Sequence, residues 1–242
     1  MTVADDELRR RDRLAAAAQA LGLALNQATL GQLMAYQQLL QRWNRVYNLT
    51  ALRDPDEMLS HHLIDCLAVV APLRQVVADL PHSGALRILD VGSGGGLPGV
   101  VLALVEPGWQ VSCVDTVAKK ANFIRQVAAE LRLPNLQGLH ARVEALPVTA
   151  GQFQVITSRA FASLVDFTQL SLLALAKDGV WMAMKGKVPD AEMAVLPSSV
   201  QVFHVEQLLV PGLDAQRCLV WLRLQAAKPP PEVVVNESDQ PG

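Results

Sequence analysis

Apolar residues recur at a helical spacing through the first 75 residues of the chain. One run has a period near 3.6 and follows Asn26, a residue suited to capping a helix: Leu30, Leu33, Met34, Leu40, Trp43 and Tyr47. A second helix is predicted from Asp54-Pro55, because Asp followed by Pro is typical of a helix start, and is expected to run to about Ala71. The N-terminal third is therefore expected to be helical.

From Arg87 onwards the pattern changes to short apolar runs that alternate with helical stretches, which is typical of β-α-β units and a parallel sheet. The expected strands lie at 87–91, 110–115, 136–140, 153–157, 179–184, 200–207 and 217–223, and the helices between them near 98–106, 117–132, 163–176 and 189–196. The turn Pro211-Gly212-Leu213-Asp214 separates the last two strands, so we expect them to pair antiparallel. The prediction is an α/β fold with a seven-stranded, mostly parallel sheet and a C-terminal antiparallel hairpin.

The expected organisation is an N-terminal helical extension (1–84), an α/β domain (85–227) and a flexible, proline-rich tail (228–242). Hydrophobic residues make up 51% of the chain and charged residues 18%, which is typical of a globular protein. The charged N-terminus lacks a secretory signal and no apolar run is long enough to span a membrane, so we expect a cytoplasmic protein without membrane contact. The three cysteines form no C-x-x-C pair, so we expect neither a disulfide framework nor a metal site.

A glycine-rich turn follows the first expected strand: Gly92-Ser93-Gly94-Gly95-Gly96-Leu97-Pro98-Gly99. A strand, such a turn and a helix N-terminus together present backbone N–H groups to a ligand, with no Cβ atoms in the way. Gly94, Gly96 and Gly99 also spell G-x-G-x-x-G, and Asp115 lies 21 residues beyond Gly94, about where a ribose-binding acid is expected. The motif alone fits either S-adenosylmethionine or NAD.

Two features favour S-adenosylmethionine. Asp90 stands just before the turn, where a carboxylate suits a cationic cofactor better than an anionic pyrophosphate. A short-chain dehydrogenase also needs a tyrosine after its cofactor-binding half, whereas Tyr36 and Tyr47, both in the N-terminal helices, are the only tyrosines of the chain. An NAD-linked oxidoreductase or a redox-sensing module remains the alternative from another class.

Further candidate residues follow the later strands. Asp115 is placed to accept both ribose hydroxyls, or else to cap the next helix. Val143 and Glu144 follow the third strand, where the edge of an adenine is expected, although Glu144 could simply be solvated. Arg159 follows the fourth strand at the ligand-binding edge of the sheet. In the second N-terminal helix His61, His62 and Asp65 share a face, which is either a hydrogen-bonded helix surface or a cluster facing substrate.

These residues carry a family resemblance that covers most of the chain. The matching stretches are Trp43-Asn44, Asn48-Leu49-Thr50, His62 through Asp65, Asp90 through Gly99, Asp115 with Lys119-Lys120, Arg142-Val143-Glu144, Thr157 through Ala162, and Lys185-Gly186. The chain resembles the ribosomal RNA small subunit methyltransferase G family, the bacterial 16S rRNA guanine-N7 methyltransferases. Cys66 stands where a serine is expected, and the proline-rich tail is not a family feature.

The resemblance implies a Rossmann-like class I methyltransferase fold and cofactor contacts at Gly92, Leu97, Val143, Glu144 and Arg159, with Asp115 at the usual ribose position. Asp90, Gly94 and Gly96 complete the expected cofactor-binding set. It also implies methyl transfer from S-adenosyl-L-methionine to N7 of a guanine in the decoding-region loop of 16S rRNA, as naked RNA or in the small ribosomal subunit. The fold by itself leaves a methyltransferase acting on a small molecule or a protein as a further alternative.

Guanine N7 carries a free lone pair, so the expected catalysis is mainly positioning and needs no general base. Arg159, and neither His61 nor His62, is the residue expected to act in the chemical step. With a net charge of −2, RNA contact should rest on local basic residues rather than on the field of the whole protein. The candidates are Arg42, Arg45, Arg53, Lys119, Arg159, Lys185 and Lys187.

Overall fold

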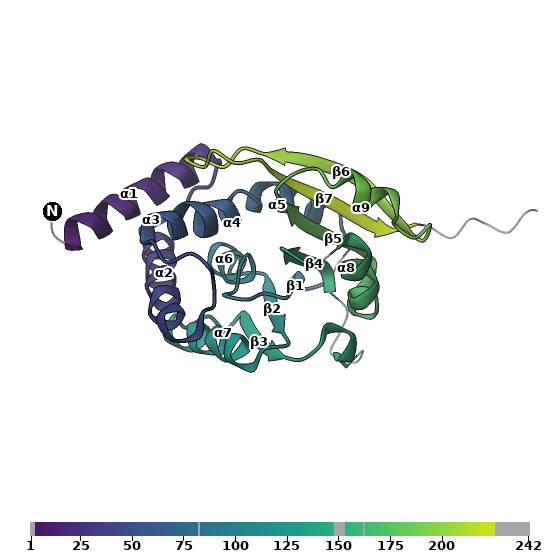
Figure 1. Ribbon diagram of the computed structural model, residues 1–242, viewed down its shortest axis with the longest axis horizontal. Helices are drawn as coiled ribbons and strands as arrows, with labels where there is room; N and C mark the ends of the chain where they lie inside the picture. The colour runs from purple at the N-terminus through teal and green to yellow at the C-terminus, as the bar shows by residue number, and fades with distance from the viewer. Residues whose placement is uncertain (1–2, 82, 148–152, 162, 226–242) are drawn as a thin grey trace, which may run out of the picture.

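Two long helices begin the chain in the computed structural model, which describes residues 3–81, 83–147, 153–161 and 163–225 (Figure 1). Helix α1 spans Val3–Ala20 and α2 spans Gln27–Tyr47. The Asn26 side chain accepts a hydrogen bond from the Thr29 backbone N–H at 2.8 Å, which confirms the predicted cap. The expected tail 228–242 and Ala162 lie outside the described residues.

The next helical segment begins at Pro55 as predicted but is not one regular α-helix. It consists of α3 (Pro55–Met58), a π-helix (Leu59–Ile64), α4 (Asp65–Leu67) and α5 (Val70–Ala78), so the predicted end at Ala71 is wrong. The π-helical backbone includes the carbonyl of His61, which accepts a hydrogen bond from Arg159 Nη1 at 2.9 Å. Short π-helical turns often occur at functional sites, and this one bonds to the edge of the sheet.

The sheet contains the seven predicted strands in the order β3-β2-β1-β4-β5-β7-β6. They are β1 (Arg87–Val91), β2 (Gln110–Asp115), β3 (Leu136–His140), β4 (Phe153–Arg159), β5 (Leu175–Lys185), β6 (Val200–Leu208) and β7 (Arg217–Leu224). The first five pair in parallel, while β7 is antiparallel to both β5 and β6. This arrangement confirms the predicted Rossmann-like class I methyltransferase fold.

Helices cover both faces of the sheet (Figure 1). The connecting helices are α6 (Gly99–Val105), α7 (Ala118–Glu130), a 3₁₀ turn (Val143–Ala145), α8 (Leu164–Ser171), a 3₁₀ turn (Leu172–Ala174) and α9 (Asp190–Ala194). One buried cluster joins side chains of α1, α2, α5, α6 and α7 to one face, and a second joins α8 to the other face. The expected boundary at residue 84 stays a prediction, because residues on both sides of it share the first cluster.

Strand β5 begins at Leu175, four residues before the predicted start at 179. Leu175 pairs with Phe153, and the register then shifts between Phe153 and Val155 before regular pairing resumes at Val180. Such a bulge adds residues to one strand only and interrupts the alternation of apolar and polar positions. The helix predicted to about 176 ends as α8 at Ser171 and continues as a 3₁₀ turn to Ala174, so the prediction was two residues too long because β5 begins at Leu175.

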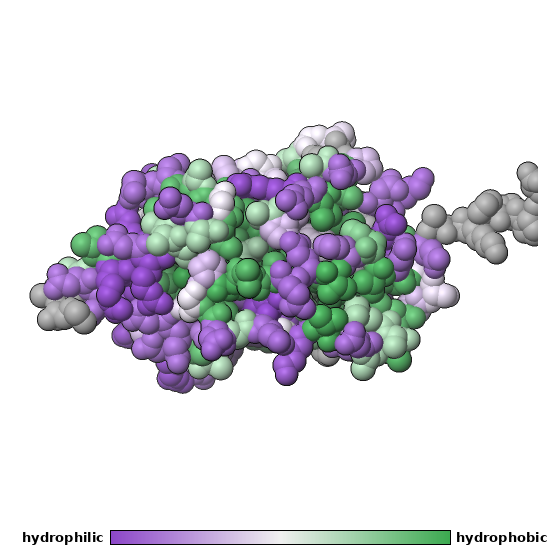
Figure 2. Space-filling view, turned by 90° about the horizontal axis from the view of Figure 1, so that it is seen from above, coloured by the Kyte–Doolittle hydropathy of each residue, from purple (hydrophilic) through white to green (hydrophobic). Residues whose placement is uncertain are grey.

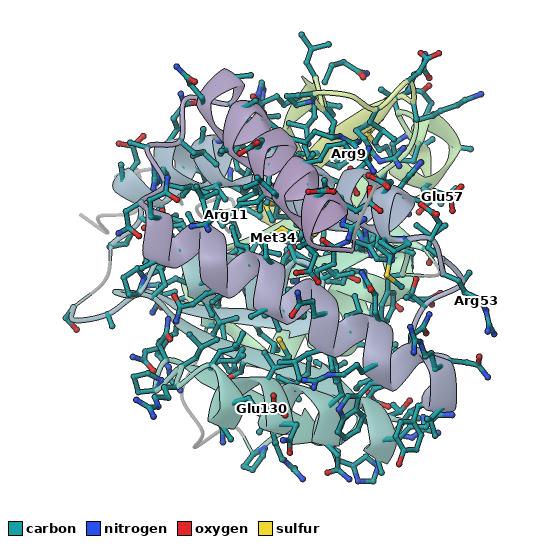
Figure 3. The ribbon with its side chains drawn as sticks, turned by 90° about the vertical axis from the view of Figure 1, so that its left-hand side faces the viewer. Arg9, Arg11, Met34, Arg53, Glu57 and Glu130 are labelled. Carbon is teal, nitrogen blue, oxygen red and sulfur yellow. The ribbon has the colours of Figure 1, made fainter. Side chains whose placement is uncertain are left out.

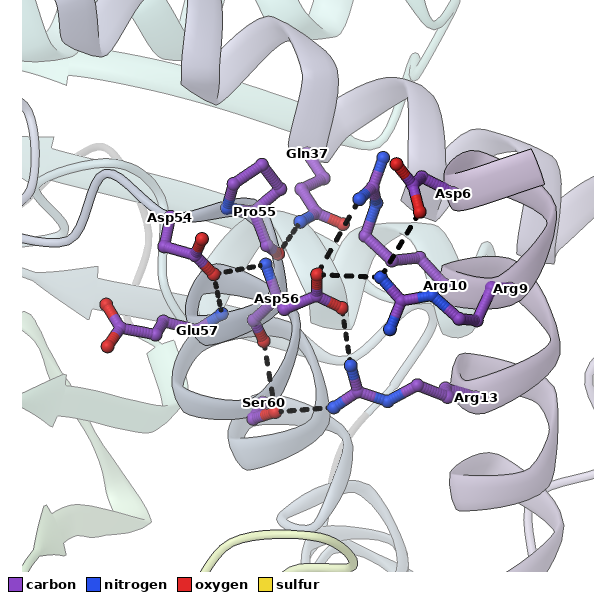
Figure 4. Close-up of polar contacts among 10 residues, drawn as sticks. All are labelled: Asp6, Arg9, Arg10, Arg13, Gln37, Asp54, Pro55, Asp56, Glu57 and Ser60. Atoms are coloured by element: carbon purple, nitrogen blue, oxygen red, sulfur yellow. Dashed lines mark hydrogen bonds and ion pairs between the residues drawn. The ribbon is translucent and has the colours of Figure 1, made fainter. Parts of the chain in front are cut away.

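Helix α1 is fastened to the segment that carries the π-helix (Figure 4). Asp56 of α3 lies within ion-pair distance of three arginines of α1: Arg13 at 2.5 Å, Arg9 at 3.1 Å and Arg10 at 3.8 Å. Figure 3 shows α1 and α2 side by side at an angle, with Arg53 projecting outward, and Figure 2 shows hydrophilic side chains gathered at the α1 end. Of the described helices, none has the length and hydropathy needed to cross a bilayer.

Candidate active site

The glycine-rich turn lies at the carboxyl end of β1, where its backbone takes conformations that favour glycine. Gly92 and Gly94 have φ angles of 66° and 58°, and a Cβ atom built on Gly94 would meet no atom closer than 3.9 Å. The Gly94 N–H donates to Asp115 Oδ2 at 3.0 Å, and the Val117 N–H donates to Asp115 Oδ1 at 2.9 Å. Asp115 therefore holds both the turn and Val117, the residue that precedes α7. Its contact with a ribose stays a prediction.

Asp90 and Gly96 lie beneath the turn rather than in a cavity. Asp90 is 0% exposed, and its Oδ2 accepts the Gly99 N–H at 2.9 Å at the start of α6. Burial raises the pKa of the Asp90 carboxyl to about 7, although the Gly99 hydrogen bond opposes this shift. A Cβ atom on Gly96 would clash with Val100 Cγ2, so this glycine permits close packing of the turn on α6. Their contact with a cofactor stays a prediction, and the buried Asp90 is not placed to repel a pyrophosphate directly.

Two cavities meet at Gly92, which lines both of them. The smaller has a volume of about 320 Å³ and brings together the predicted residues Asp115, Val143 and Glu144 with Lys120 and Phe161. The larger, of about 460 Å³, brings together the predicted Gly94, Leu97 and Arg159 with Ser93 and Gly95. Volumes of this size are typical of small-molecule sites.

Polar residues of the helical segment form part of the wall of the larger cavity. His61, His62 and Asp65 all line it, so their shared face is directed at the cavity and is not an ordinary helix surface. His62 Nε2 lies 2.7 Å from the Thr50 hydroxyl, and the Thr50 backbone N–H donates to Asn44 Oδ1 at 2.9 Å. The loop after α2 is thereby tied to the π-helix.

A buried carboxylate between two arginines completes this wall. Asp65 Oδ2 accepts from Arg159 Nη1 at 3.3 Å, and Asp65 Oδ1 accepts from Arg217 Nε at 2.8 Å. The residue after Arg159, Ala160, has a φ of 62°, which is strained for a residue with a Cβ atom and occurs here in the lining of the cavity. Three distant segments therefore converge at Asp65.

Burial and the neighbouring Arg159 lower the pKa of His62 to about 4. The His62 ring is therefore neutral throughout the physiological pH range. For Arg159, burial works against the charged form, but neighbouring acidic groups that include Asp65 leave its pKa above the ordinary value. At neutral pH the cavity presents a neutral imidazole beside a guanidinium.

The predicted RNA-contacting residues do not form one cluster. Arg159 and Lys185 line the larger cavity, and Lys185 Nζ is paired with Glu192 at 2.8 Å. Arg42 pairs with Glu130 on the outside of α2, and the others are exposed: Arg45, Arg53, Lys119 and Lys187. Their contact with RNA stays a prediction.

Sequence reasoning missed Arg217, which lines the larger cavity, and Tyr36, which bonds to the turn from outside both cavities. Arg217 lies 152 positions from Asp65, and only the strand order places the start of β7 beside the π-helix. Tyr36 was considered only as a tyrosine in the wrong place for a dehydrogenase, yet its hydroxyl donates to the Gly95 carbonyl at 2.6 Å. The one available signal was its polar group on the apolar face of α2.

Comparison with solved structures supports the fold. A crystal structure of TrmN from Thermus thermophilus matches with a TM-score of 0.50 at 20% identity, covering 69% of this chain and 53% of the other. A crystal structure of a mutant of MtNAS matches with a TM-score of 0.51 at 16% identity, covering 87% and 81% of the two chains. At these identities the likeness concerns the fold alone.

Comparison with known sequences defines the family. Ribosomal RNA small subunit methyltransferase G of Paracidovorax citrulli is 60% identical over 230 residues, 92% of this chain and 93% of the relative. The protein of the same name from Leptothrix cholodnii is 61% identical over 213 residues, 88% of this chain and 95% of the relative. The profile of the family described as rRNA small subunit methyltransferase G matches residues 29–220, which include both cavities. The chain therefore belongs to the rRNA small subunit methyltransferase G family.

Proposed function

We propose that this protein transfers a methyl group from S-adenosylmethionine to N7 of a guanine in the decoding-region loop of 16S rRNA, in the cytoplasm. The observation that carries the proposal is the pair of cavities that meet at Gly92 in a chain of this family. One cavity offers a carboxylate suited to ribose hydroxyls, and the other offers a neutral imidazole beside a guanidinium. An NAD-linked oxidoreductase is not favoured by the family.

The residues of the smaller cavity fit an adenosine. Asp115 has two acceptor oxygens at the cavity wall, while Val143 and Phe161 supply apolar surface for a purine ring. The glycines of the turn leave open space beside Gly94, and Ser93 Oγ is buried with no hydrogen-bond partner among the described residues. We assign the adenosine to the smaller cavity and the methionyl part to the entrance of the larger one, near Gly94 and Leu97.

Bound S-adenosylmethionine supplies an electrophilic methyl group on a positively charged sulfur. Guanine N7 is already nucleophilic, so the residues of the larger cavity need only hold the base in line. The low pKa of His62, about 4, makes its ring a weak base, and Thr50 holds the ring, so we assign it the role of a fixed wall rather than a proton acceptor. Arg159 is fixed by the His61 carbonyl and by Asp65, and we assign it the role of orienting the base and the cofactor where they meet.

The same chemistry requires no Lewis acid, because both reacting groups are activated without one. We therefore propose that no metal ion takes part in the transfer itself. The acceptor base should come from a loop of the RNA, where unstacking costs little and recognition relies on shape, stacking and phosphate contacts. Binding should weaken as salt concentration rises, because phosphates are contacted.

The test is methylation of 16S rRNA with methyl-labelled S-adenosylmethionine, using naked rRNA and small subunits in parallel. Labelled 7-methylguanosine is mapped by the chain cleavage that this base permits after chemical reduction. The expected result is one labelled guanine in the decoding-region loop, with Asp115→Ala as the control deficient in cofactor binding. Label in another base, or only in a protein or a small molecule, would refute the proposed acceptor.

A further inference from the structure

Tyr36 reaches from the middle of α2 to the back of the glycine-rich turn. Its side chain is fully buried, and its hydroxyl donates a hydrogen bond to the Gly95 carbonyl at 2.6 Å. No other donor to this carbonyl is found among the residues that the structure describes. Because Gly95 lines the larger cavity, a residue of the N-terminal helices holds the backbone of the turn.

The same helix also limits the space behind Gly95. A Cβ atom built on Gly95 would lie 2.9 Å from Leu40 Cδ1, one helical turn beyond Tyr36. The Tyr36 ring packs against Phe123 of α7, with ring centroids 6.4 Å apart. Burial raises the pKa of the Tyr36 phenol well above its ordinary value, so the hydroxyl is protonated and able to donate at neutral pH.

The turn is thus held at neighbouring residues by two different side chains. On the side of the smaller cavity, Asp115 accepts the N–H of Gly94, while on the opposite side Tyr36 donates to the carbonyl of Gly95. Glycines at positive φ have little conformational preference of their own, so contacts of this kind must select one arrangement of the turn. Without the phenol hydroxyl, the Gly95 peptide would lose its bond in a buried position.

We propose that Tyr36 is a positioning residue for the cofactor: its hydroxyl holds the glycine-rich turn open to the methionyl part of S-adenosylmethionine. Tyr36 lines neither cavity and acts through Gly95. This inference rests on the cofactor of the proposed function but not on the identity of the acceptor. Its expected signature is weaker cofactor binding, with little change in the transfer step once cofactor is saturating.

The test compares Tyr36→Phe with the matched control Tyr47→Phe. Tyr47 is the other tyrosine of the chain, also on α2, and is 38% exposed. Calorimetry without RNA measures the Kd for S-adenosylmethionine and S-adenosylhomocysteine, and steady-state assays separate KM from kcat. For Tyr36→Phe we expect both Kd values and the cofactor KM to rise roughly three- to tenfold, the scale of one lost hydrogen bond. The kcat and the KM for RNA should stay within about twofold, and Tyr47→Phe should match the wild type.

Unchanged cofactor Kd values in a folded Tyr36→Phe variant would overturn the proposal, as would a loss confined to kcat. Should that variant not fold, wild-type protein carrying ¹³Cζ-labelled tyrosine provides the test, with its two signals assigned through Tyr47→Phe. Cofactor addition is expected to shift the Tyr36 signal alone, and an unmoved signal at saturation would overturn the proposal. Wild type that binds cofactor but fails to methylate 16S rRNA refutes only the proposed acceptor. Wild type that binds no cofactor refutes both.

Discussion

Replacing Asp65 with asparagine should weaken the polar wall of the larger cavity. The carboxylate accepts from Arg159 and Arg217, whose side chains are only 23% and 22% exposed. Asparagine keeps the shape of the side chain but removes the charge, and its amide N–H₂ must face one of the two guanidinium groups. Removing one partner of a buried ion pair lowers the free energy of unfolding by about 3–5 kcal/mol. Because both arginines are partly exposed, we expect Asp65→Asn to lose an amount near the lower end of this range, about 3 kcal/mol.

The assay is urea unfolding at neutral pH for wild type, Asp65→Asn, Arg217→Gln and the double variant. If Arg217 and Asp65 interact as the 2.8 Å contact indicates, the double variant should lose less free energy of unfolding than the sum of the losses in the two single variants, by about 1 kcal/mol or more. Single-turnover transfer should also fall in Asp65→Asn, because Arg159 loses an anchor. A loss below about 1 kcal/mol for Asp65→Asn, or losses that add fully, would refute the reasoning.

Three further predictions concern titration and the cofactor. Because the pKa of His62 is about 4, the rate of single-turnover transfer should be nearly independent of pH between about 6 and 8, both in wild type and in His62→Ala. If the wild-type rate instead rises through the histidine range and His62→Ala abolishes that rise, His62 acts as a base. Asp90 has its pKa raised from 3.8 to about 7, so between these values it binds more protons when folded, and its contribution to stability is lost as pH rises from about 4 to about 7. Asp90→Asn keeps an acceptor for the Gly99 N–H but does not titrate, so its melting temperature should rise relative to that of the wild type between about pH 4 and 7 and level off above pH 7. A melting-temperature difference that does not depend on pH would contradict the shift. Asp115→Ala should weaken cofactor binding by roughly 1.5–3 kcal/mol, the scale of hydrogen bonds to a charged group, and unchanged calorimetric affinity in a folded variant would exclude its ribose role.

The fold was largely predictable because strands and helices follow local patterns. The start of each strand before β5, the C-terminal hairpin and the Asn26 cap were all predicted from the spacing of apolar residues and from turn or capping residues. The bulge before Val180 was not, because it depends on how β5 pairs with β4. The π-helix at Leu59–Ile64 was not predicted either, since it bonds through the His61 carbonyl to Arg159, which lies 98 positions further along the chain.

The site was predictable where its residues follow strands in order. Asp115, Val143 and Glu144 line one cavity and Arg159 lines the next, because the carboxyl ends of parallel strands share one edge of the sheet. Asp90 and Gly96 belong to the same motif but serve to pack the turn, a distinction that only the burial of each side chain reveals. Arg217 begins the second strand of the antiparallel hairpin and Tyr36 lies on a helix before the sheet, so neither position follows from the order of parallel strands.

The most direct measurement of the central claim uses 16S rRNA transcribed with 7-deazaguanosine triphosphate in place of GTP. This replacement exchanges N7 for a carbon but keeps O6, N1 and N2, so the faces that pair and most of the recognition surface are preserved. With saturating S-adenosylmethionine, we predict that unmodified rRNA accepts one methyl group and that the 7-deaza transcript accepts none while still competing for binding. Methyl transfer to the 7-deaza transcript at an undiminished rate would contradict guanine N7 as the acceptor.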